Sequence, residues 1–229
     1  NGSVTFPQEL NPYSVRINLT SSNAGNTIST GGNQLTGLNF NGSGTWDLLD
    51  AVELSHFAGI GGTLNTNGHD INTGDVNIGG AGTLNLSTST ITTLGFYVTG
   101  GAVTINGGGA NVVMTSSFLS FQPQGAHFNS VTFTGTANTQ GAFSCDSLFA
   151  QGDFVNINSA ITAGYAEFAD DVTLSLPFVG GDVVLNNPGK LVRISNMTLT
   201  GDMTSNGNSG FPIQVEGYSG AGILTKTSG

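Results

Sequence analysis

Few residues in this chain have side chains suited to acid–base chemistry. The chain of 229 residues holds 14 Asp and Glu and three His, and two carboxylates are adjacent at Asp170-Asp171. A glycosidase needs two carboxylates about 5 to 10 Å apart beside a groove. Neighbours on one strand point to opposite faces of the sheet, so this pair does not favour catalysis. A turn before a strand at Val172 is the preferred interpretation.

The other reactive residue types are scattered. The three histidines, His56, His69 and His127, show no metal-ligand spacing, so the sequence predicts no zinc site. Cys145 is the single cysteine, so it cannot form an intrachain disulfide. Its Phe-rich surroundings predict a small buried apolar residue and disfavour a catalytic nucleophile.

Two binding roles remain as expectations from single residues or short clusters. Calcium prefers carboxylate and carbonyl oxygens, and Asp47, Asp50 and Glu53 could supply them if they met at one corner. A solvated acidic edge is the preferred interpretation, with no cofactor. Trp46, the only tryptophan, is either a core residue or, less favoured, an exposed aromatic platform for carbohydrate.

A repeat between Gly61 and Leu119 shows which elements must position these residues. Thr63-Leu64-Asn65, Thr83-Leu84-Asn85 and Thr104-Ile105-Asn106 start 20 and 21 residues apart. Further columns share the same steps: Ile71, Ile91 and Val112, and then Ile78, Val98 and Leu119. Short strands and glycine turns at such a period predict an all-β fold, a parallel β-helix or β-solenoid. We expect coils of about 20 to 30 residues, closed by inserted loops.

Charge excludes some classes of partner. Charged residues make up 8% of the chain, Lys and Arg number four, and the net charge is −10. A nucleic-acid binder needs clustered Lys and Arg, so that class is excluded, and an anionic membrane surface is disfavoured. No apolar run approaches the ~18 residues of a membrane span. The chain starts at Asn1 with Gly-Ser-Val, which is not the pattern of a signal peptide, so we expect a mature or excised portion. The composition favours an extracellular portion of something longer.

The whole chain is interpreted as one solenoid segment, 1–229, with four parts. These are a leading segment (1–35), the regular repeat (36–119), irregular Phe-rich coils (120–209) and an exit segment (210–229). Neighbouring domains of the same long chain are expected to cover its ends. In the irregular part we expect seven strands, at 130–134, 153–158, 165–168, 172–176, 182–185, 191–195 and 197–200. We expect binding, if any, in this aromatic-rich, irregular half after Leu119.

Three segments resemble a known family. They are Phe40 to Leu48, which contains Gly44-Thr45-Trp46, then Gly62 to Gly68, and then Gly82 to Ile91. They resemble repetitive β-solenoid segments of giant cell-surface adhesins of gliding bacteria that use the Type IX secretion system. The match covers about residues 36 to 95, but a Gly expected between Leu86 and Ser87 is missing. The resemblance implies a surface filament, and Asp146-Ser147-Leu148 looks like the O-glycosylation signal of such bacteria, at Ser147.

The leading hypothesis is therefore a non-enzymatic structural and adhesive segment on the bacterial cell surface, in contact with polysaccharide or another substratum. A carbohydrate-active β-helix enzyme, a lyase or hydrolase, is the first alternative. A component of a phage or pilus-type fibre is the second, because it has the same composition. The near absence of Lys and Arg suits an exposed structural segment, since it removes sites for trypsin-like proteases.

Overall fold

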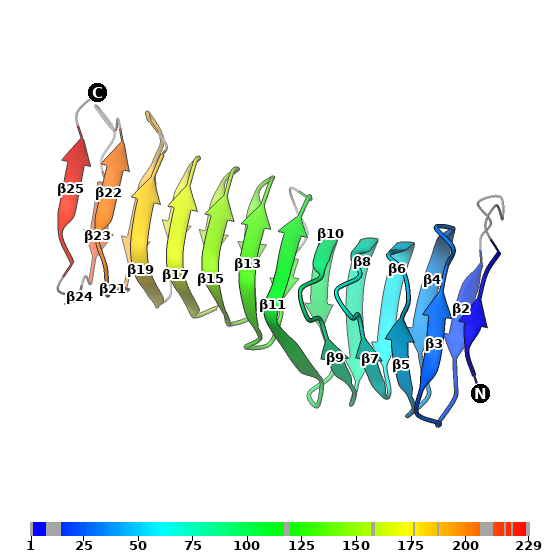
Figure 1. Cartoon of the computed structure of the whole chain (residues 1–229). Helices are drawn as coiled ribbons and strands as arrows, with labels where there is room; N and C mark the ends of the chain where they lie inside the picture. Colours follow the sequence, from blue (N-terminus) through cyan, green and yellow to red (C-terminus); the bar gives the residue numbers. More distant parts are fainter. Residues whose placement is uncertain are drawn as a thin grey trace. The chain divides into compact units, whose positions relative to one another are not determined.

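The computed structural model is a β-solenoid of parallel strands (Figure 1). It describes residues 2–7, 15–116, 120–156, 159–175, 177–186, 188–206, 213–217, 219–220 and 222–227, and these residues form no helix. The predicted fold class is confirmed. Two compact units are present, Asn1–Val113 with Ala126–Phe128, and Met114–Gly125 with Asn129–Gly229. We refer to them as unit 1 and unit 2.

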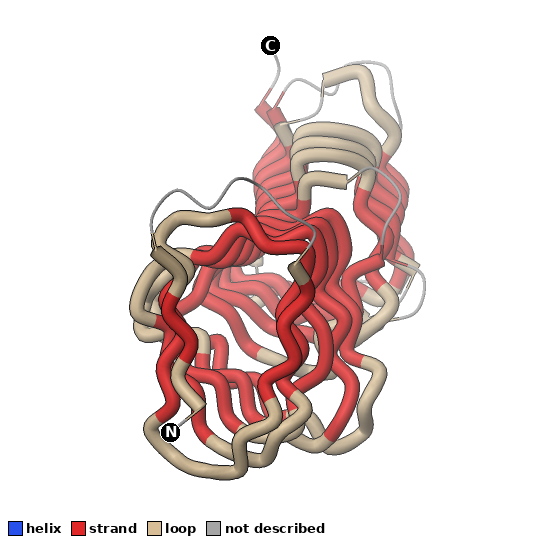
Figure 2. The backbone as a smooth tube through the Cα atoms, turned by 90° about the vertical axis from the view of Figure 1, so that its right-hand side faces the viewer, coloured by secondary structure: helices blue, strands red, loops and turns tan. Residues whose placement is uncertain are grey.

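Unit 1 is built from two rows of parallel strands. One row contains β1 (Val4–Thr5), β3 (Asn26–Ser29), β5 (Thr45–Leu48), β7 (Thr63–Asn65), β9 (Thr83–Asn85) and β11 (Thr104–Met114). The other contains β2 (Arg16–Leu19), β4 (Gln34–Phe40), β6 (Val52–Ile60), β8 (Ile71–Gly80) and β10 (Thr90–Val98). Seen end-on in Figure 2, the coils of unit 1 lie one behind another.

Unit 2 repeats this arrangement. One row contains β12 (Ser120–Gln122), β14 (Ala137–Thr139), β16 (Phe154–Asn156), β18 (Val172–Leu174), β20 (Val192–Ser195) and β23 (Ile213–Glu216). The other contains β13 (His127–Phe133), β15 (Phe143–Ala150), β17 (Ile161–Phe168), β19 (Phe178–Leu185), β22 (Met203–Asn206) and β25 (Leu224–Thr227). β21 (Met197–Leu199) stacks on the start of β19, and β24 (Ser219–Gly220) stacks on β21.

The repeat columns of the sequence are the register of the stack. Thr63 pairs with Thr83 and Thr83 with Thr104, while Ile71 pairs with Ile91 and Ile78 with Val98. Leu119 lies outside the described residues. Each column places one residue type at the same point of successive coils, so apolar side chains stack into a core between the rows. The periodicity therefore specifies the pairing of strands.

Aromatic side chains fill the core of both units. In unit 1 the ring of Phe40 lies 6.4 Å from Trp46 and 5.5 Å from Phe57, between centroids. In unit 2 successive ring contacts at 5.0 to 6.1 Å join Phe121, Phe133, Phe143, Phe154, Phe168 and Phe178. All six are at most 4% exposed. The coils of unit 2 therefore use the bulk of these six side chains to fill the core, and binding by this part of the chain stays a prediction.

Each of the seven strands expected in this part overlaps an observed strand, although several bounds differ, and Ile157, Asn158 and Leu176 lie outside the described residues. Within 120–209 the sequence missed β12, β14, β15 and β22. In β15, Phe143, Cys145, Leu148 and Ala150 are buried, and between Cys145 and Leu148 the alternation of inward and outward residues slips by one. That slip hides the period of two by which a strand is recognised.

Candidate functional site

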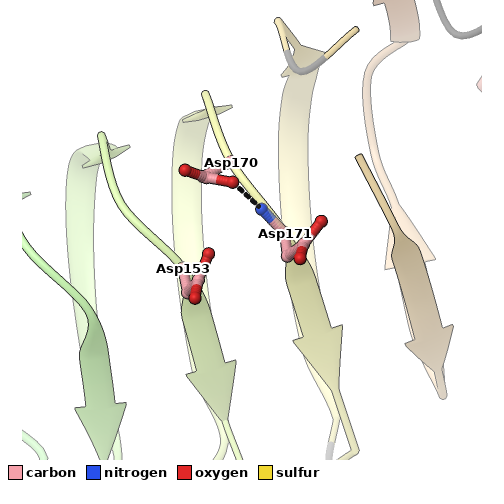
Figure 3. A group of neighbouring side chains, drawn as sticks. All are labelled: Asp153, Asp170 and Asp171. Carbon is pink, nitrogen blue, oxygen red and sulfur yellow. Dashed lines mark hydrogen bonds between the residues drawn. The ribbon is translucent and has the colours of Figure 1, made fainter. Parts of the chain in front are cut away.

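Three carboxylates meet at one corner of unit 2, although they lie on different coils. Phe154, Val172 and Val192 pair in register, so Asp153 and Asp171 stand at equivalent points, each just before a strand (Figure 3). With Asp170 they form a group in which one carboxylate oxygen of each residue lies within 4.8 Å of the others. The expected turn at Asp170-Asp171 is confirmed, and it brings the two side chains together. We call Asp153, Asp170, Asp171 and Lys190 the acidic corner.

Hydrogen bonds already engage much of the acidic corner. The Asp171 carboxylate accepts from the Leu191 amide at 2.6 Å, and Asp170 accepts from the Asp171 amide at 2.9 Å. Lys190 forms an ion pair with Asp170. The hydrogen bond from Lys190 is the largest influence on the pKa of Asp170 and holds it below its ordinary value, although burial opposes this. The pKa of Lys190 is raised by the same bond.

This environment limits the chemistry of the acidic corner. A general acid at neutral pH needs a carboxyl with a raised pKa, and the pKa of Asp170 moves the other way. Grouped carboxylate oxygens are suitable calcium ligands, but calcium takes six to eight oxygens and would compete with the Lys190 ammonium. The corner therefore acts in this structure as an ion-paired link between neighbouring coils.

The calcium corner expected at Asp47, Asp50 and Glu53 does not form as a group among the described residues. Asp47 accepts a hydrogen bond from Asn65 at 2.7 Å. Asp50 accepts from the Ser29 hydroxyl and from the Thr30 and Gly31 amides, each at 2.8 Å. Glu53 lines a hollow of about 260 Å³ with Gly32, Ala51, Val52, Asp70 and Asn72. The three carboxylates do not meet, because each lies against different residues, and calcium binding by the chain stays a prediction.

For Asp50, burial raises the pKa, but the hydrogen bonds from Thr30, Ser29 and Gly31 outweigh it and leave the pKa below its ordinary value. The charged carboxylate is thus the form that fits this turn. The Asp50 carboxylate accepts hydrogen bonds from the backbone N–H groups of this turn. Because Thr30 is fully buried, water could not replace the carboxylate as the partner of its N–H group.

Trp46 is not a carbohydrate platform. It pairs with Leu64 in the core column, and only 1% of its surface is exposed. Its indole N–H is buried without a hydrogen-bond partner in the described part of the chain. The core alternative is confirmed. Cys145, expected in the core, is 2% exposed, and burial together with Asp146 raises the pKa of its thiol to about 12, so it is a poor nucleophile.

Ser147 lies on β15, half-buried, and pairs with Tyr165 on β17. Glycosylation at this position stays a prediction. Among the histidines, His56 lies on β6, His69 in a turn and His127 on β13. The groups able to hold a metal among the described residues include no histidine.

Polar side chains that repeat in the stack bond to each other. In unit 1, Asn106 donates to Asn85 at 2.6 Å, Asn85 to Asn65 at 2.7 Å and Asn65 to the carboxylate of Asp47 at 2.7 Å. We call this series the asparagine ladder. In unit 2, Asn206 donates to Asn186, and Asn186 donates to Glu167 at 2.6 Å. In both units the last acceptor is a carboxylate, which makes that bond charge-assisted.

No family model, no curated protein and no solved structure matches the chain. No helix among the described residues is long and apolar enough to cross a bilayer.

Sequence reasoning also missed a contact between His56 on β6 and Asp75 on β8, whose Nδ1 and Oδ2 lie 2.8 Å apart. Their positions pair in register, as do those of Gly37 and His56. A search for columns of polar residues at steps of 19 to 21 would have found this contact.

Proposed function

We propose that the chain is a non-enzymatic structural segment of a large extracellular filament on a bacterial surface. The observation that carries this proposal is the asparagine ladder. Each side-chain amide of the ladder donates a hydrogen bond to a residue of the neighbouring coil. These polar side chains therefore link the coils of the stack to one another. The resemblance of residues 36 to 95 to surface adhesins of gliding bacteria supports the same role. Adjacent domains of the parent chain would cover the open ends of the stack.

A carbohydrate-active enzyme is the second candidate, because the acidic corner groups three carboxylates. The lowered pKa of Asp170 counts against a general acid at this corner. The purified chain should be incubated with a panel of neutral and acidic polysaccharides, with release of reducing ends and of unsaturated products as readouts. We expect no cleavage. Cleavage that is lost in Asp170→Ala or Asp171→Ala would defeat the structural role.

The full-length gene product gives a second test. A filament segment predicts a polypeptide of great length with many more Gly-Thr-Leu coils and a C-terminal sorting domain. A short polypeptide with a signal peptide and a single solenoid would favour the enzyme instead.

A further inference from the structure

One row of positions on the outer face of unit 1 brings charged and aromatic side chains close together in a chain that has few of either. Along the sheet, Arg16 pairs with Gly37, Gly37 with His56, His56 with Asp75 and Asp75 with Gly95. These five positions, on β2, β4, β6, β8 and β10, form the outer row. Neighbouring strands of a sheet lie about 4.8 Å apart, so the row is a straight line of evenly spaced positions.

Both glycines of the outer row are covered by large side chains. A methyl group placed on Gly37 would lie 3.5 Å from Arg16 Nε, so the exposed Arg16 side chain extends over Gly37. A methyl group placed on Gly95 would lie 2.6 Å from Tyr97 Cε2 and 2.9 Å from its hydroxyl oxygen. The partly exposed Tyr97 ring therefore folds back across Gly95, beside Asp75.

The middle of the outer row is a fixed polar pair. His56 Nδ1 and Asp75 Oδ2 lie 2.8 Å apart, and their side chains are 28% and 39% exposed. Each holds the other in one orientation while part of its surface faces solvent. The four side chains follow one another along the row as Arg16, His56, Asp75 and Tyr97. They form a line of hydrogen-bonding groups with an aromatic ring at one end.

The chemistry of this line fits a saccharide. A pyranose has an apolar C–H face that packs on an aromatic ring, and hydroxyls that need both donors and acceptors. Tyr97 offers the ring, Asp75 an acceptor, and Arg16 donors. A peptide would require an apolar pocket or an unpaired strand edge, whereas the outer row lies on the face of a paired sheet. Nucleic acid would require several cations, and the row contains one arginine.

The charges of the outer row and of the whole chain favour a neutral saccharide over an acidic one. With His56 neutral, Arg16 and Asp75 cancel, while the whole chain carries −10. An acidic polysaccharide would be repelled by the chain as a whole. The geometry points to a binding strip for a neutral polysaccharide, made by Arg16, His56, Asp75 and Tyr97. This strip adds an adhesive contact to the structural role proposed above and does not depend on that role.

The test is affinity electrophoresis of the full chain through gels that contain a neutral polysaccharide (xyloglucan, galactomannan or laminarin) or an acidic one (alginate or polygalacturonate). We expect retardation by at least one neutral polymer and by neither acidic one. Tyr97→Ala should weaken binding roughly tenfold, since it removes the stacking ring. Tyr97→Phe should bind within about threefold of the unchanged chain, because the ring remains.

Two further variants separate binding from folding. Asp75→Asn keeps the shape of the side chain and should also weaken binding, whereas Tyr165→Ala, at a partly exposed aromatic in unit 2, should not. Circular dichroism must show that each variant keeps its strands. Equal retardation of Tyr97→Ala and the unchanged chain would overturn the strip, as would binding of acidic polymers alone. Neither of these two binding results would affect the proposed structural role. Cleavage of a polysaccharide that is lost in His56→Ala would instead overturn both the structural role and the proposal that the strip only binds.

Discussion

The asparagine ladder gives the sharpest prediction for stability. Replacing Asn85 by Ala removes two hydrogen bonds, one donated to Asn65 and one accepted from Asn106. A typical bond contributes about 0.5 to 1.5 kcal/mol net, so the two together are worth about 1 to 3 kcal/mol. Asn85 is half-buried and Asn106 exposed, so water replaces part of the loss. We expect unit 1 to lose about 1 to 2 kcal/mol of unfolding free energy.

The chain contains its own probe for this measurement. Trp46 is the only tryptophan and is buried in unit 1, so its fluorescence in a urea titration follows that unit. Asn72→Ala is the matched control, since Asn72 is an exposed asparagine of β8 outside the ladder. Surface changes of that kind shift stability by about 0.5 kcal/mol or less. If Asn85→Ala and Asn72→Ala unfold at the same urea concentration, the ladder does not stabilise the stack.

The direction of the ladder can be tested at the same position. Asn85→Asp keeps the acceptor for Asn106 but places a carboxylate oxygen against the Asn65 oxygen, where an N–H had been. At neutral pH this variant should be at least as unstable as Asn85→Ala. Below about pH 4 the new carboxyl becomes protonated and can donate again, so its deficit should shrink. A deficit independent of pH would contradict the assigned direction.

Three other predictions concern the core, the acidic corner and proteolysis. Trp46→Phe removes a buried unpaired N–H and should cost under about 1.5 kcal/mol in thermal melting, against about 3 to 5 for Trp46→Ala; similar losses would refute this. Because Lys190 lowers the pKa of Asp170, the stabilisation is present above the unfolded value near 3.8 and is lost as pH falls through the folded value. The melting difference between the unchanged chain and Asp170→Asn should therefore be largest near neutral pH and vanish in acid, and a constant difference would contradict it. Trypsin should cut after Arg16 before Arg193, as mass spectrometry would show, because β20 is paired with both β18 and β23; the reverse order would argue against this pairing.

The fold could be predicted because residues that stack on one another recur in the sequence at the period of the coil. Identical residues such as Thr63 and Thr83 recur since each must fit the same point of successive coils. Trp46 follows the same rule, because its place after Gly44-Thr45 puts it in the column of Leu64. Where coil lengths vary, as around β15, this constraint weakens and the strand was missed.

Sites were harder to predict because they depend on contacts between columns. The acidic corner requires Asp153 and Asp171 to be placed on adjacent coils, and nothing in the local sequence links them. The cover of Gly95 by Tyr97 depends on the conformation of one side chain, which composition and period do not specify. Trp46 was predictable, because the favoured interpretation was a core residue and only 1% of its surface is exposed.

The asparagine ladder also has a consequence for how the chain folds. Each amide donates to the coil that precedes it in the sequence, and the series ends on Asp47. A chain that emerges from a secretion pore with its N-terminus first would present each acceptor before its donor arrives. Every new coil would then dock on a finished template, and the carboxylate would act as the starting point. The hydrogen bonds of the ladder thus all run in one direction along the chain, and moving the carboxylate to the other end of the ladder should slow refolding.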